Sequence, residues 1–278
     1  MMRNQILVTA VAILFIVGIY QLPKAVVSKK QDMRTSDTKA KPAETTKKED
    51  AHQVQLTKIQ TDKLEFWKKE IVNSQAIEKK RTFADSIAKL FAGINKLDSV
   101  AYYYEQALGN SKTEKYLLLV ANAWFEAFRF ALSVDATRAN GYGEQARKFY
   151  EQLLIQNPKL YIAKANMAMT FVATPTPMKG ITLLREIVAE EPENQLALFN
   201  LGLLAIQSGQ HDKAVARFET LLKVNPNHIE AKLYLAESLL NTQNTPKAKE
   251  LLTEITTLTA DSVAIYKQIA KETLEKIK

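Results

Sequence analysis

The sequence predicts an all-α fold built as a solenoid of helix–turn–helix repeats. Pro158, Pro192 and Pro226 follow one another at intervals of 34 residues, a period typical of such repeats. Apolar residues recur three and four positions apart, which is the spacing of one face of a helix, and almost no segment alternates with a period of two. Since the 278 residues include only 8 glycines and 8 prolines, we expect many helices and essentially no sheet.

The first predicted element is a membrane segment near the amino terminus. After a short tail at residues 1–4, residues 5–22 carry no charged side chain. A helix of this length, at about 1.5 Å per residue, comes close to spanning a hydrocarbon core of about 27–30 Å. We therefore expect an N-terminal transmembrane helix; a cleaved signal peptide is the alternative, although no small-residue cleavage site follows. A lipid-modified lipoprotein is excluded, because the chain has no cysteine.

The next two predicted elements are a linker and a capping helix. Residues 23–52 are expected to form a flexible basic linker, because the stretch from residue 28 holds no large apolar side chain except Met33. Residues 53–80 are expected to contain an N-terminal capping helix, with a short coiled coil as the alternative. Its apolar residues recur at intervals of three to five: Leu56, Ile59, Leu64, Trp67 and Ile71.

Five repeats are predicted between residues 81 and 262. In the clearest of them, the small residues Gly202 and Ala214 allow two helices to approach closely, and Phe218 fills the remaining gap. Asn225-Pro226 ends the second helix. The predicted units are residues 81–114, 115–160, 161–194, 195–228 and 229–262, and a C-terminal capping helix follows at residues 263–278.

The unit at residues 115–160 is 12 residues longer than the others. We expect a lengthened first helix at about residues 114–134. A loop is predicted at about residues 135–143, because Asn140, Gly141 and Gly143 are typical of turns.

This pattern resembles the tetratricopeptide repeat (TPR) family. The family has a large residue at place 4 of its repeat, small residues at places 8 and 20 and an aromatic residue at place 24; here these are Leu198, Gly202, Ala214 and Phe218. Ala205 and Leu221 depart from the family pattern. The resemblance implies a TPR-type α-solenoid, a right-handed superhelix whose concave face holds a protein or peptide partner.

The layout also resembles membrane-tethered TPR proteins of the bacterial envelope. These proteins often carry their repeats outside the cytoplasm, so we expect a single-pass membrane protein with its repeats in the periplasm. The cytoplasmic side is the alternative, because Arg3 precedes the apolar run whereas Lys24, Lys29 and Lys30 follow it.

The resemblance further implies a partner-binding groove, which the first helices of the repeats would line. The corresponding residues are Tyr116, Leu119, Ile162, Asn166, Met169, Leu196, Phe199, Asn200, Leu203, Ile206, Leu233 and Tyr234. Asn166 and Asn200 occupy the same place in consecutive units, where they would hydrogen-bond to the backbone of a bound segment. The basic residues with which chaperone-binding members clamp a carboxylate are missing. The alternative is a tight superhelix, or an amino-terminal helix that folds back and covers these residues.

The charge distribution and the absence of known motifs argue against nucleic-acid binding, metal binding and catalysis. Residues 1–80 hold 15 Lys and Arg against 9 Asp and Glu, whereas residues 81–278 hold 23 against 21. The repeats therefore lack the basic stripe of a nucleic-acid-binding protein. His52, His211 and His228 have no metal-ligand partner three or four residues away, and the sequence contains no catalytic motif.

We therefore expect no enzyme, cofactor or metal. Two functional classes remain: an adaptor or scaffold that binds a protein or peptide partner, and a structural, self-associating subunit of a membrane complex. The sequence does not determine the partner or the oligomeric state.

Overall fold

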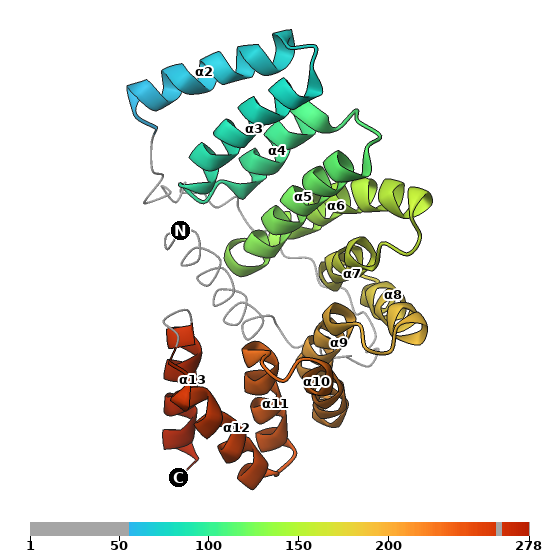
Figure 1. Cartoon of the computed structure of the whole chain (residues 1–278), viewed down its shortest axis with the longest axis vertical. Coiled ribbons are helices and arrows are strands. Elements are labelled where there is room, and N and C mark those ends of the chain that lie inside the picture. The colour runs from blue at the N-terminus through green and yellow to red at the C-terminus, as the bar shows by residue number, and fades with distance from the viewer. Residues whose placement is uncertain (1–55, 260–262, 278) are drawn as a thin grey trace, which may run out of the picture.

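The computed structural model describes residues 56–259 and 263–277, and within these residues every regular element is a helix. This finding confirms the all-α prediction. The helices follow one another along a crescent, with its open side at the left of Figure 1. The predicted tail, transmembrane segment and linker, at residues 1–4, 5–22 and 23–52, lie outside the described residues.

Neighbouring helices are joined in pairs by short connections. The pairs are α3 (Ile77–Ala92) with α4 (Leu97–Leu108), α5 (Glu114–Val134) with α6 (Ala136–Gln156), α7 (Tyr161–Met169) with α8 (Pro177–Glu190), α9 (Gln195–Gln207) with α10 (His211–Val224), and α11 (Ile229–Asn241) with α12 (Thr245–Thr257). A 3-10 helix, η1 (Thr170–Ala173), extends α7 toward α8. The first helix of each pair from α5 onward lies on the inner side of the crescent (Figure 1).

The pair α9–α10 shows why these residues form a repeat. Asn194 caps α9, since its Oδ1 accepts a hydrogen bond from the backbone N–H of Ala197 at 3.0 Å. Gly209 ends the helix with a φ of 71°, a conformation that glycine adopts without steric cost. The ring of Phe218 is fully buried against Gly202. Burial of a side chain of this size contributes about 1.5–3 kcal/mol.

The loop predicted after α5 is wrong. Only Asp135 separates α5 from α6, and its carboxylate caps α6 by accepting a hydrogen bond from the Thr137 N–H at 3.2 Å. Ala139, Gly143 and Ala146 form the buried stripe of the new helix. The glycine permits close packing rather than a turn, because a Cβ at residue 143 would lie 3.2 Å from the Phe128 ring. The 12 extra residues therefore lengthen two helices, each of which has 21 residues.

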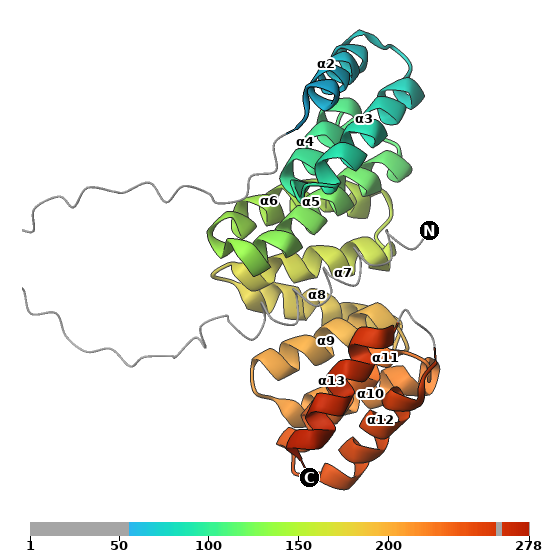
Figure 2. The same ribbon diagram turned by 90° about the vertical axis from the view of Figure 1, so that its left-hand side faces the viewer.

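Two further helices lie at the ends of the stack (Figure 2). Helix α2 (Lys58–Asn73) buries Leu64 and Ile71 on the α3 side. Helix α13 (Ala264–Lys276) buries Tyr266 and Ala270 beside the last pair. Each end helix thus covers an apolar face that would otherwise meet water, as stacked repeats require.

One helix of the described part, α5, is long and apolar enough to cross a membrane by length and composition alone. In this structure 44% of its apolar window is buried inside the protein. Trp124, Phe125 and Phe128 lie within the main core cluster, which is the position of a core helix.

The buried side chains form two clusters that meet within α9. Leu201 belongs to the cluster that begins at Leu64, whereas Leu198 belongs to the one that ends at Ala270. The inner surface between α5 and α13 is therefore built from both clusters.

Candidate functional site

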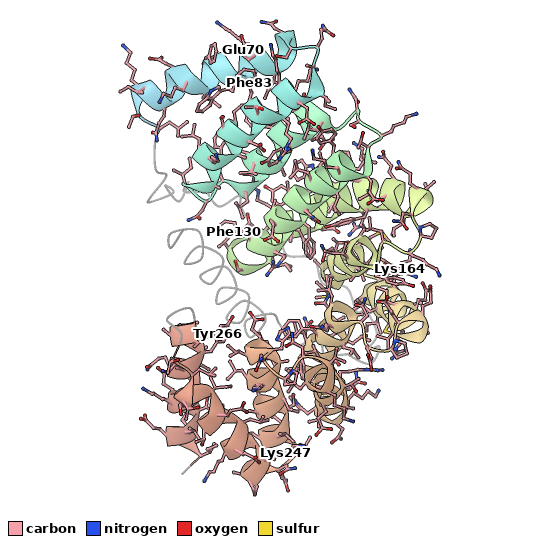
Figure 3. All side chains as sticks on the ribbon, viewed as in Figure 1. Glu70, Phe83, Phe130, Lys164, Lys247 and Tyr266 are labelled. Atoms are coloured by element: carbon pink, nitrogen blue, oxygen red, sulfur yellow. The ribbon has the colours of Figure 1, made fainter. Side chains whose placement is uncertain are left out.

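A cavity of about 190 Å³ lies among the inner helices. Helices α5, α7, α9, α11 and α13 contribute its walls, together with η1. Its lining is mainly apolar and aromatic: Phe125, Phe128, Arg129, Leu132, Asn166, Met169, Val172, Leu196, Phe199, Asn200, Leu203, Glu230, Tyr234 and Tyr266. Figure 3 shows Tyr266 of α13 across the open side of the crescent from Phe130 of α5. Side chains from five helices can therefore contact one bound group.

Phe199 is held in place by its aromatic neighbours. Its ring centroid lies 5.9 Å from those of Phe218 and Tyr234, both in edge contact, and 5.1 Å from His228 in a stacked contact. Such offset and edge contacts are the favourable geometries for aromatic pairs. Three rings therefore pack around Phe199 in this wall of the cavity.

The Asn200 side chain is the unusual polar group of the cavity. It is 7% exposed and lines the cavity, and none of the hydrogen bonds among the described residues involves its carboxamide. The buried side-chain atoms without a partner lie elsewhere, on Arg81, Asn140 and His211. Asn166 is different, because its Nδ2 donates to Asn122 Oδ1 at 3.4 Å, and that oxygen also accepts a bond from the Tyr150 hydroxyl at 2.7 Å. Asn200 thus offers one donor group and one acceptor to an occupant.

The charged groups of the cavity already have partners. The Tyr266 hydroxyl donates to Glu230 Oε1 at 2.6 Å. Arg129 donates to Glu126 Oε1 at 3.0 Å, and its guanidinium lies 6.0 Å from the Phe125 ring. Burial raises the pKa values of Tyr234 and Tyr266, so both hydroxyls are neutral near pH 7. Arg129 is thus paired with a carboxylate, whereas the Glu230 carboxylate is hydrogen-bonded to a neutral hydroxyl and keeps its negative charge.

The cavity brings together seven of the twelve residues assigned to the groove from the sequence: Asn166, Met169, Leu196, Phe199, Asn200, Leu203 and Tyr234. The other five lie elsewhere. Tyr116 is buried and donates its hydroxyl to Glu78, while Leu119 packs against the first core cluster and Ile162 is 47% exposed. Ile206 and Leu233 pack in the second cluster. The role of all twelve in binding stays a prediction.

Sequence reasoning missed seven lining residues: Phe125, Phe128, Arg129, Leu132, Val172, Glu230 and Tyr266. The first four lie in the extra length of α5, which a 34-residue frame does not align with the other repeats. Tyr266 belongs to α13, which was assigned a capping role alone. Glu230 could be identified from the sequence, since it occupies place 2 of its repeat, one of the inner places.

The two histidines of the described part are not near a group that could hold a metal ion. His228 instead caps α11, because its Nδ1 accepts a hydrogen bond from the Ala231 N–H at 3.2 Å. This contact gives the ring a structural role.

The fold defines a class of protein, the solenoid of helical repeats, whose inner surface holds the cavity. Two family models, both described as tetratricopeptide repeat, match residues 177–215 and 205–271. The chain is therefore similar to the tetratricopeptide repeat family over residues 177–271, which extend from α8 into α13. No curated protein matches its sequence.

Solved structures show a similar fold at low sequence identity. A tetratricopeptide repeat protein from Parabacteroides merdae ATCC 43184 is 16% identical, with a TM-score of 0.50 over 77% of this chain and 86% of that chain. MamA is 14% identical, with a TM-score of 0.45 over 70% of this chain and 96% of that chain. YrrB, described as a TPR protein with an unusual peptide-binding site, is 18% identical, with a TM-score of 0.40 over 76% and 99%.

Proposed function

We propose that the protein is a membrane-tethered scaffold that binds a segment of a partner protein in the inner cavity. The observation that carries this proposal is the Asn200 carboxamide, which lines an apolar cavity and makes no hydrogen bond to another described residue. TPR proteins bind protein or peptide partners, which supports the general kind of ligand. A bound segment would supply the missing hydrogen bonds.

The unpaired amide favours an extended segment over a helical one. A helix satisfies its backbone groups internally, whereas an extended segment has free N–H and C=O groups. Asn166 and Asn200 come from consecutive repeats, so they can contact two points of one extended backbone. The cavity of about 190 Å³ is large enough for an aromatic side chain, since an engineered cavity of about 150 Å³ binds benzene. The preferred ligand is an uncharged segment with a bulky apolar side chain.

The membrane tether is the second part of the proposal. Residues 5–22 carry no charge, and residues 23–55 separate them from the repeats. A tether of this kind would hold the cavity near the bilayer surface and raise the effective concentration of a membrane-bound partner. Alkaline extraction of membranes tests the tether, because an anchored chain stays in the pellet. Protease protection in spheroplasts then tests the proposed periplasmic side.

The binding site is tested by selecting peptides of about 12 residues from a displayed random library, a length that would cross two or three repeats. We expect selected peptides to be rich in aromatic and aliphatic residues. Asn200→Leu is expected to weaken the best peptide at least about tenfold, since it removes about 1.4 kcal/mol or more of hydrogen bonding. Asn241→Leu is the matched control, because Asn241 is exposed on α11. Equal binding by both variants would refute the assigned site.

A structural, self-associating subunit is the second candidate. Two apolar side chains of the end helix α2 favour it: Ile59 is 69% exposed and Phe66 is 55% exposed. If copies pack through α2, the chain from residue 56 should sediment as a dimer or larger, and Phe66→Ser should make it a monomer. A monomer in both cases would favour the scaffold.

A further inference from the structure

We infer that the chain's own apolar segment at residues 6–20 lies along the inner surface and inserts a side chain into the inner cavity when that segment is not in a bilayer. This inference rests on the proposed binding function, because it concerns the regulation of the same site. The membrane would then open the site by removing its internal occupant.

The chemistry of the segment matches that of the cavity. Residues 6–20 read Ile-Leu-Val-Thr-Ala-Val-Ala-Ile-Leu-Phe-Ile-Val-Gly-Ile-Tyr, with no charged residue. The cavity walls supply aromatic and aliphatic partners such as Phe128, Leu132 and Leu203. Burial of such side chains is favourable in proportion to the apolar area removed from water. Residues 1–55 contain no other long uncharged apolar run.

The polar groups of the cavity also fit this occupant. Arg129 is paired with Glu126, and the Glu230 carboxylate accepts a hydrogen bond from Tyr266 and is 40% exposed. An uncharged segment that leaves this carboxylate in contact with water therefore buries no unpaired charge. The carboxamide of Asn200 still needs a donor and an acceptor. The hydroxyl of Thr9 or a backbone amide of the segment can supply them.

The segment can reach the cavity of its own chain. Residues 21–55 connect it to the described part, and 35 residues can extend up to about 115 Å, at about 3.3 Å each. The first turn of α2, where this connection enters, points to the open side of the crescent (Figure 1). No part of the stack therefore has to open before the segment meets the inner surface.

Two environments compete for the same residues. Exposing an apolar segment of this length to water is unfavourable, whereas burying it in a bilayer or in an apolar groove is favourable. A lipid bilayer would shift the population toward the open cavity because it binds only the released segment. The partner site would then be available at the membrane and covered away from it.

Disulfide trapping tests this inference, since the native chain has no cysteine that would interfere. The full chain is made by cell-free translation with one cysteine in the segment and one in the cavity. The segment positions are Ala10→Cys, Leu14→Cys and Gly18→Cys, because the register is open. The cavity positions are Leu132→Cys and Leu196→Cys, which are half-buried and thus tolerant of the change. Ile155→Cys on α6, 82% exposed and away from the cavity, is the matched control.

Without lipid, we expect an intramolecular disulfide for at least one segment position with Leu132→Cys or Leu196→Cys, and none with Ile155→Cys. Vesicles of phosphatidylethanolamine and phosphatidylglycerol, present during translation, should lower the yield of this disulfide at least about fivefold. Equal disulfide yields with Leu132→Cys, Leu196→Cys and Ile155→Cys would overturn the inference. It would also be overturned if no disulfide forms at the two cavity positions, or if the vesicles do not change the disulfide yield. A disulfide-linked dimer as the main product would assign the occupant to a second copy and would also overturn it.

The results of disulfide trapping and of peptide binding test the internal occupant and the proposed scaffold function separately. If peptides bind the chain that starts at residue 56 but no cavity disulfide forms, the scaffold proposal stands and the internal occupant is rejected. If the disulfide forms but no peptide binds, the cavity serves the chain's own segment and the scaffold proposal fails.

Discussion

The ring of Phe218 on α10 lies so close to Gly202 on α9 that a Cβ at residue 202 would be 2.5 Å from the Phe218 Cζ. Phe218 is fully buried and has little room to move. Gly202→Ala should therefore lower the free energy of unfolding by about 1–3 kcal/mol, the usual cost of overpacking a core. Urea unfolding followed by circular dichroism measures this change.

Gly141 provides the control for Gly202. It lies in the interior of α6, and a Cβ there would have no neighbour within 4 Å. Gly141→Ala should raise the free energy of unfolding by about 0.5–1 kcal/mol, because alanine is the better helix former. Similar destabilisation by both substitutions would contradict the packing argument at Gly202.

Arg147 on α6 forms hydrogen bonds to the 3-10 helix η1 beside the cavity. Its Nη1 donates to the backbone oxygen and the hydroxyl of Thr170 at 3.0 and 3.1 Å, and its guanidinium lies 4.9 Å from the Phe171 ring. Arg147→Met should lower the free energy of unfolding by about 1.5–3 kcal/mol, as expected for the loss of hydrogen bonds from a charged donor. Arg185→Met on the exposed side of α8 should change stability by less than about 0.5 kcal/mol. Thermal unfolding of both variants checks the difference.

Buried tyrosines predict a loss of stability at alkaline pH. Burial raises the pKa of Tyr142 from 10.0 to about 12, and burial also raises those of Tyr104, Tyr150, Tyr234 and Tyr266. A raised folded-state pKa means that the folded protein holds a proton that the unfolded chain loses. The resulting stability is complete below pH 10 and is lost as the pH rises through the folded-state pKa.

Tyr150 allows this pH dependence to be measured at one residue. It is fully buried, and its hydroxyl donates to Asn122. Above pH 10, Tyr150→Phe should make the fall in unfolding free energy shallower by up to about 1.4 kcal/mol per pH unit. At pH 8 the same variant reports only the lost hydrogen bond. Denaturant unfolding between pH 8 and 11.5 separates the two effects, and an unchanged slope would contradict the prediction.

The sequence predicts the repeats well where small and large residues alternate at fixed places. Gly202, Ala214 and Phe218 can be recognised without a structure, because the close approach of two helices demands those sizes. The loop expected near Asn140 failed for the opposite reason. Local turn preference there is overridden by the packing of Ala139, Gly143 and Ala146 along one buried face of α6.

The candidate site was harder to predict than the fold. Places within a repeat identify the inner face, so Asn166 and Asn200 were found. Phe125 and Tyr266 line the cavity because of the extra length of α5 and the position of α13. Both features depend on contacts between segments that are far apart in the sequence. An inner place in the repeat does not determine the direction of a side chain: the Tyr116 hydroxyl donates to Glu78, and Tyr116 does not line the cavity.

Asn200 should show opposite effects on stability and on binding. Its carboxamide lines the apolar cavity and makes no hydrogen bond to another described residue, so Asn200→Leu replaces a polar group among apolar neighbours by an apolar side chain of similar size. We expect the free energy of unfolding to rise by about 1–2 kcal/mol. Peptide capture by the same variant should fall, because the hydrogen bonds to the bound backbone are lost. Calorimetry on the peptide-free protein measures the first change, and titration with a selected peptide measures the second. A variant that loses stability as well as binding would show that Asn200 supports the fold, and the site would then have to be sought on another face of the stack.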